Sequence, residues 1–239
     1  MDEKIINNIK TLAVETISNA KSGHTGIVLS AAPILYTLYA KHINVDVKNP
    51  KWINRDRFVM SAGHGSALLY SILHFAGFDI KIEDLKNFRK IDSITPGHPE
   101  YGVTPGVDMS TGPLGQGIAS AVGMAIVGKS LSKKFILPKM GSIEKGDSVF
   151  DYKVYVLCGD GDLMEGISYE AMSLAGNLNL DNLIVLYDSN NISLDGDTSN
   201  TFTENVLDRF KAAGWYTDLV RNGNDVTAID NAITKAKNA

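Results

Sequence analysis

The sequence has few cysteines, no long apolar run and no pattern of a secretion signal. It contains one cysteine, Cys158, among 239 residues, so no disulfide can form within the chain, and a reducing, cytoplasmic setting is expected. No apolar run approaches the roughly 20 residues that cross a bilayer, and the first residues lack the basic-then-apolar order of a secretion signal. We therefore expect a soluble protein without a membrane segment.

The chain also has no large excess of positive or negative charge. The chain has 23 Lys and Arg against 27 Asp and Glu, a net charge of −4, which offers no basic surface for nucleic acid or an anionic membrane. A phosphorylated ligand would therefore need a local basic pocket. Because 44% of the residues are hydrophobic, the chain can bury a sizeable core, and we expect residues 1–239 to form one domain.

Two short apolar runs predict strands that are buried on both faces. They span residues 154–158 and 183–187, are continuous and rich in β-branched residues, and are too short for helices. Residues 166–179 between them carry apolar side chains at helical spacing, which completes a strand, helix, strand unit. The predicted fold class is α/β, with a mostly parallel sheet and helices on both faces.

Other segments give simpler predictions. Residues 5–20 and about 27–42 predict helices, and Ser66 is a plausible cap for a further helix. Residues 137–153 predict a connecting loop, and residues 194–198 predict a turn, since no Glu follows where a calcium loop needs one. Gly115, Ala119 and Gly123 predict a smooth helix face for close packing, either on the sheet or on another subunit.

Polar residues follow both predicted strands. Asp160 lies in Gly-Asp-Gly directly after the first strand, and Asn190 follows the second. The carboxyl ends of parallel strands meet at one edge of the sheet, so these two side chains can converge on one ion. A hard cation such as Mg²⁺ takes carboxylate and amide oxygens and shares its remaining sites with phosphate, while Gly159 and Gly161 let the backbone approach that phosphate.

Three histidines lie in glycine- or proline-bounded turns. His24 and His64 each lie between glycines before a helix, and His98 lies in Pro-Gly-His-Pro. Glycines at such turns cost backbone entropy and add no core volume, so we expect these imidazoles to face a ligand. His42 and His74 lie within helical patterns and are predicted to be structural.

Taken in order, these segments resemble transketolase over nearly the whole chain. The resemblance rests on Ser22-Gly23-His24, Ser61-Ala62-Gly63-His64-Gly65, Pro96-Gly97-His98-Pro99-Glu100, Thr111-Gly112-Pro113-Leu114-Gly115-Gln116-Gly117, Gly159-Asp160-Gly161 and Asp188-Ser189-Asn190-Asn191-Ile192. It implies the amino-terminal, diphosphate-binding domain of an enzyme that uses thiamine diphosphate and Mg²⁺, for which Ca²⁺ or Mn²⁺ can substitute. The implied reaction, part of the pentose phosphate pathway, moves a two-carbon ketol unit from a ketose phosphate to an aldose phosphate.

The resemblance also implies roles for individual residues. It places a metal on Asp160, Asn190 and the Ile192 carbonyl. It places the diphosphate near Gly161 and His64, and it assigns catalytic roles to His24, His64 and His98. The cofactor rings are implied to lie on Gly112, Pro113 and Leu114, and Glu165 is implied to lie near the cofactor at a subunit contact.

Two departures from the family pattern bear on this assignment. Thr25 stands where the family usually has proline, and no segment resembles the pyrimidine-binding or carboxy-terminal domains. The resemblance therefore implies half of an active site, with a carboxy-terminal subunit or domain as partner, sugar phosphates as substrates, and a homodimer or heterotetramer. The alternatives are a dihydroxyacetone synthase or deoxyxylulose phosphate synthase relative, or a cofactor-binding module or fragment without catalysis.

Overall fold

A three-stranded parallel sheet lies at the centre of the structure. The computed structural model describes residues 1–138, 145–190, 192–193 and 196–239. The strands β1 (Arg57–Met60), β4 (Val154–Gly159) and β5 (Leu183–Asp188) are ordered β1-β4-β5, and both pairings are parallel. The predicted adjacent pair of parallel strands is therefore confirmed.

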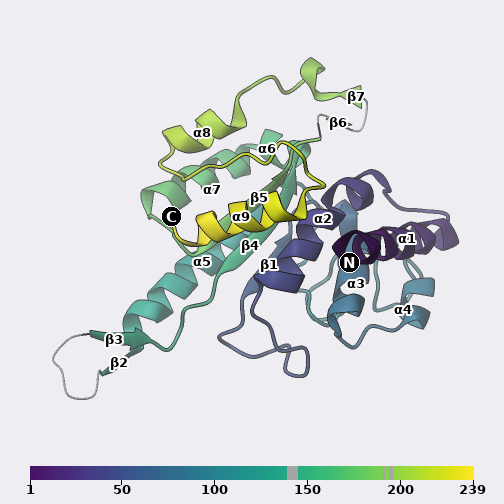
Figure 1. Cartoon of the computed structure of the whole chain (residues 1–239), viewed down its shortest axis with the longest axis horizontal. Helices are drawn as coiled ribbons and strands as arrows, with labels where there is room; N and C mark the ends of the chain where they lie inside the picture. The colour runs from purple at the N-terminus through teal and green to yellow at the C-terminus, as the bar shows by residue number, and fades with distance from the viewer. Residues whose placement is uncertain (139–144, 191, 194–195) are drawn as a thin grey trace.

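Helices cover both faces of this sheet (Figure 1). One layer contains α1 (Asp2–Ala20), α2 (Gly26–Lys41), α3 (Ser66–Ala76) and α9 (Val226–Lys237). The other contains α5 (Gln116–Lys134), α7 (Gly166–Asn177) and α8 (Val206–Ala212). The helices predicted over 5–20, 27–42 and 166–179 correspond to α1, α2 and α7, and the predicted α/β fold class is confirmed.

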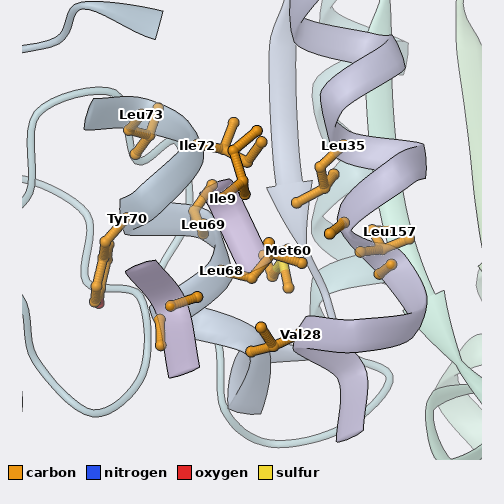
Figure 2. Packing of buried hydrophobic residues seen from close by; sticks show 14 of the residues in the cluster. Ile9, Val28, Leu35, Met60, Leu68, Leu69, Tyr70, Ile72, Leu73 and Leu157 are labelled. Carbon is orange, nitrogen blue, oxygen red and sulfur yellow. The ribbon is translucent and has the colours of Figure 1, made fainter. Parts of the chain in front are cut away.

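Alternate residues of each strand pack into opposite layers. In β4, Tyr155 and Leu157 belong to the core with α1, α2 and α3, while Val154 and Val156 belong to the core with α5 and α7. Figure 2 shows Leu157 lying among side chains of the first layer. Because both faces of β4 are buried, its sequence is continuously apolar rather than alternating.

Short elements connect these layers. They are the 3₁₀ turns η1 (Gly63–Gly65) and η2 (Thr198–Asn200), the helices α4 (Ile82–Lys86) and α6 (Asp160–Met164), and the strand pairs β2 (Ile136–Pro138) with β3 (Lys145–Ser148) and β6 (Ile192–Ser193) with β7 (Gly196–Asp197). The prediction of a loop over 137–153 is wrong in part, because β2 and β3 form an antiparallel pair, and residues 139–144 of that range lie outside the described residues. Of the turn predicted over 194–198, residues 194 and 195 lie outside the described residues.

The structure corrects the prediction for Ser66 and shows how two glycines of the predicted smooth face are packed. The Ser66 hydroxyl does not cap α3 but donates to the Gly97 carbonyl at 2.8 Å. A methyl group at Gly115 would lie 2.8 Å from the Glu165 Cβ, whereas one at Gly123 would meet nothing within 4 Å. Gly115 therefore packs closely within the chain, and the predicted packing of the exposed Gly123 on another subunit stays a prediction. The close approach to the sheet involves Gly117, where a Cβ would lie 2.5 Å from the Ser61 Cα.

Candidate active site at the carboxyl ends of the strands

Asp160 begins α6 directly after β4 and is buried, with 4% of its surface exposed. Its Oδ1 accepts a hydrogen bond from the Tyr187 hydroxyl. Its Oδ2 is buried and has no hydrogen-bond partner among the described residues. A buried carboxylate oxygen without a partner is costly unless it binds a proton donor or a cation, so Asp160 is suited to hold a metal ion.

The end of β5 lies beside Asp160. Asp188, the register partner of Gly159, accepts hydrogen bonds from the Ser30 hydroxyl at 2.5 Å and the Asn190 amide at 3.2 Å. Burial raises the pKa of Asp188, and the hydrogen bonds from Ser30 and Asn190 oppose that shift. The structure thus places Asp160 and Asn190 at the ends of adjacent strands.

The residue types here favour a hard cation. Over the described parts of the chain, no group of three or more His, Cys, Asp or Glu side chains could hold a metal. A cation would therefore take oxygen atoms of mixed origin: the free Oδ2 of Asp160, the side-chain oxygen of Asn190 and a backbone carbonyl such as that of Ile192. Mg²⁺ accepts such ligands and completes its shell with phosphate or water.

Asp162 organises the turn after β4. Its Oδ1 accepts hydrogen bonds from the Ser61 hydroxyl at 2.6 Å and the Gly115 amide at 3.0 Å, and its Oδ2 accepts one from the Gly159 amide at 3.1 Å. The Ser61 oxygen also accepts the Ile118 amide at 3.2 Å. One buried carboxylate therefore joins the end of β1, the end of β4 and the start of α5.

The segment 111–115 lies across these strand ends in close contact. A methyl group at Gly161 would lie 3.0 Å from the Leu114 Cδ1, and one at Gly112 would lie 3.4 Å from the His98 ring. Gly112 has a φ of 151° and Gly115 a φ of 78°, values that favour glycine. The structure thus brings Gly112, Leu114 and Gly161 together. Pro113 and Glu165 lie at the exposed border of this group.

The three predicted histidines lie near one another. The rings of His24 and His64 meet edge to face with centroids 5.3 Å apart, and the His98 ring lies against Gly112. Burial is the first cause of a lowered pKa at all three; Arg89 adds to the shift at His24 and His98, and His24 adds to it at His64. Near neutral pH these imidazoles are mainly uncharged, so each can accept and donate protons.

The other two histidines are structural, as predicted. His42 Nε2 lies 2.9 Å from Asp230 Oδ1, which joins α2 to α9. His74 Nδ1 lies 2.6 Å from the Ile80 carbonyl.

Sequence reasoning missed several residues that shape this site. Asp162, Ser61, Tyr187 and Arg89 received no predicted role. Asp162 carried a signal, since it directly follows the Gly-Asp-Gly turn, and Ser61 directly follows a predicted strand. Arg89 carried none, because its contacts come from distant parts of the chain.

Comparison with protein families supports a single assignment. A family model described as the transketolase, thiamine diphosphate binding domain matches residues 1–239. The chain is 55% identical to transketolase of Bacillus subtilis over 99% of its own length and 34% of the relative's. It is 51% identical to transketolase of Aquifex aeolicus, covering 33% of that protein. The chain therefore spans about a third of the length of these relatives.

Solved structures give the same result. Transketolase from Leishmania mexicana matches with a TM-score of 0.94 and 46% identity, over 100% of this chain and 35% of the other. A Pichia stipitis transketolase described as a complex with sedoheptulose 7-phosphate matches with a TM-score of 0.94 and 46% identity, over 99% and 34%.

Proposed function

The chain belongs to the thiamine diphosphate-binding domain family of transketolase, and we propose that residues 1–239 supply the diphosphate-binding half of a transketolase active site. The reaction is the transfer of a two-carbon ketol unit between a ketose phosphate and an aldose phosphate. The observation that carries this proposal is the pair of adjacent strand ends that present the unpartnered, buried Oδ2 of Asp160 beside Asn190.

Asp160, Asn190 and the Ile192 carbonyl would hold Mg²⁺. The backbone at Gly161 and the His64 side chain would hold the diphosphate beside that metal. Asp160 suits this role because its free oxygen is buried, and Asn190 because an amide oxygen adds no further negative charge next to Asp160 and Asp188. Gly112, Pro113 and Leu114 would border the cofactor rings, with Glu165 at the edge of the site.

Thiamine diphosphate, when bound, supplies a nucleophilic carbon that cleaves and forms carbon–carbon bonds next to a carbonyl. The contribution of this chain is to bind, orient and move protons. His24 and His98 would contact substrate hydroxyl groups, and His64 would donate to a diphosphate oxygen. Uncharged imidazoles suit proton transfer at hydroxyl groups near neutral pH, which agrees with the lowered pKa values of all three.

A carboxy-terminal subunit or domain is the proposed partner. The edge of β5 that faces away from β4 has no strand partner within the described residues. A cleft of about 950 Å³ runs along this edge, and Val185, Tyr187, Trp215, Leu219, Ile233 and Ala239 are among its lining residues. We propose that one further β-strand of the partner segment fills the cleft, because the open sheet edge offers backbone groups and the lining residues include both apolar and polar side chains.

The cellular location and the assembly that we propose are those implied by the family. We propose a cytoplasmic enzyme of carbohydrate metabolism that assembles as a homodimer or, with a separate carboxy-terminal chain, as a heterotetramer. Across the described residues, no helix has the length and apolar character needed to span a bilayer.

Reconstitution tests the proposal. The chain would be mixed with the carboxy-terminal two-thirds of the Bacillus subtilis relative, thiamine diphosphate and Mg²⁺, and two-carbon transfer from sedoheptulose 7-phosphate would be followed. We expect transfer with both parts present and none with either part alone. Asp160→Ala should abolish it, whereas Asp181→Ala, which removes an exposed carboxylate before β5, should not. Full activity of Asp160→Ala would refute the proposed metal site.

A further inference from the structure

Arg89 occupies an unusual position between two of the proposed substrate-facing turns. Its φ is +64°, a left-handed conformation that is unfavourable for a non-glycine residue. Its amide donates to the Thr95 carbonyl at 3.1 Å, and the Thr95 hydroxyl donates to the Asp84 carbonyl at 2.7 Å. These bonds fix the backbone from which the Arg89 side chain projects.

The Arg89 side chain contacts both turns. Its Nη1 donates to the Ser22 hydroxyl at 2.7 Å, two residues before His24. On the other side, a methyl group at Gly97 would lie 3.3 Å from the Arg89 Nε and 3.4 Å from its Cγ, so the side chain lies against the backbone just before His98. Arg89 therefore bridges segments that are 75 residues apart in the sequence (22 to 97).

The two turns differ in their other support. The turn of His98 is held by α3, because Ser66 donates to the Gly97 carbonyl at 2.8 Å, and Tyr70 donates to the carbonyls of Pro96 at 2.9 Å and His98 at 3.1 Å. For the turn of His24, the hydrogen bond from Arg89 is the side-chain bond that ties Ser22 to the rest of the described structure. Arg89 therefore adds a side-chain link between the turns of His24 and His98, beside the contact of the His24 ring with His64 and the backbone bonds that join the turn of His24 to α1 and α2.

We propose that Arg89 is a positioning residue that ties the turn of His24 to the anchored turn of His98. The inference rests on the proposed function only in taking these two histidines as the groups that face the substrate. A second consequence follows from the guanidinium charge, which disfavours a positive charge on either ring. The charge of Arg89 lowers the pKa of both His24 and His98, and His24 also lowers that of His98. At His64, His24 and His98 lower the pKa, whereas Asp162 raises it.

The test compares Arg89→Gln and Arg89→Lys with Lys90→Gln in the purified chain. Lys90→Gln is the matched control, because it removes the same charge one residue away, where the exposed Lys90 side chain bonds to Asn87. Histidine pKa values would be measured by NMR titration, and amide hydrogen exchange would be measured at residues 22–24.

We expect Arg89→Gln to raise the pKa of both His24 and His98 and to speed exchange at residues 22–24 by roughly 3- to 10-fold. Arg89→Lys should preserve the lowered pKa values, because it keeps the charge, while exchange still becomes faster. Lys90→Gln should change neither. The proposal is overturned if Arg89→Gln and Lys90→Gln give the same exchange rates at residues 22–24. It is also overturned if the two variants give the same pKa values for both His24 and His98.

Cofactor binding in the same samples separates this inference from the proposed function. Arg89 has no contact with Asp160 or Asn190, so we expect both Arg89 variants to bind thiamine diphosphate with Mg²⁺ as the wild type does. If the wild type binds no cofactor, the proposed function fails while the titration and exchange results still decide the role of Arg89.

Discussion

Asp160 and Asp162 are two buried carboxylates, two residues apart, with opposite surroundings. Both oxygens of Asp162 accept hydrogen bonds from groups that belong to this chain. Asp160 has one oxygen bonded to Tyr187 and one with no partner among the described residues. Groups of the chain itself therefore satisfy the carboxylate between β1 and β4, whereas the carboxylate beside β5 keeps one buried oxygen that is available to a ligand.

The same contrast holds for the strands. β4 is paired on both sides, and its residues 154–158 are fully buried, whereas β5 is paired on one side and Val185, Leu186 and Tyr187 are half-buried along the cleft. Stability is therefore expected to depend mainly on β4 and its contacts, and binding mainly on the end and edge of β5.

The largest expected effect is on folding, from Asp162→Ala. The substitution leaves the buried Ser61 hydroxyl, the buried Gly115 amide and the part-buried Gly159 amide without their acceptor, which should lower the free energy of unfolding by about 3–5 kcal/mol. Urea denaturation followed by circular dichroism measures the change, with the exposed Asp181→Ala as control. A loss below about 1 kcal/mol would show that Asp162 does not organise this region.

Truncation of a leucine should destabilise the chain more in β4 than in β5. Leu157→Ala removes a fully buried side chain from β4 and should cost about 2–5 kcal/mol. Leu186→Ala removes a half-buried side chain from β5 and should cost less than half of that in the isolated chain. Equal losses in urea denaturation would contradict the difference drawn between the interior and the edge of the sheet.

The stabilisation of the chain by bound ligand should depend on the Asp160 carboxylate. Thiamine diphosphate and Mg²⁺ at 100 times the dissociation constant should stabilise the wild type by about 2.7 kcal/mol. Asp160→Asn should change the unliganded stability little and should gain about 1.4 kcal/mol or less from the same concentrations in a thermal unfolding experiment, because its binding is expected to be at least tenfold weaker. A gain in Asp160→Asn equal to that of the wild type would argue against a metal at this carboxylate.

The smallest expected effect concerns pH and His64. Burial lowers the folded-state pKa of His64, so at acid pH the unfolded chain binds a proton that the folded chain does not. Stability is unaffected above the unfolded pKa of about 6.5 and falls as pH drops below it toward the folded value. His64→Gln should therefore flatten the dependence of the unfolding free energy on pH below about 6.5. An unchanged slope would show that His64 is not buried in its neutral form.

The sequence predicted those parts of the fold that depend on local patterns. The strands 154–158 and 183–187 and the helix between them were found because continuous apolar runs and helical spacing are properties of neighbouring residues. The placement of Asp160 and Asn190 at the same edge of the sheet follows from one topological rule, since parallel strands end at the same edge.

Features that depend on distant contacts were missed or misread. Ser66 has the residue type of a cap, but the Gly97 carbonyl, 31 residues further on, takes its hydroxyl. Arg89 gives no local signal, because its role depends on Ser22 and Gly97 from two other segments. The β2–β3 pair has charged and glycine residues that are typical of loops.

Calorimetric titration of the purified chain with thiamine diphosphate, with and without Mg²⁺, shows whether Asp160 holds a metal ion that the cofactor needs for binding. It would be run on the wild type, Asp160→Asn and Asp181→Asn. The account predicts Mg²⁺-dependent binding to the wild type and Asp181→Asn, and at least tenfold weaker binding to Asp160→Asn, which corresponds to about 1.4 kcal/mol. Binding of equal strength to all three chains, or binding that does not depend on Mg²⁺, would contradict it.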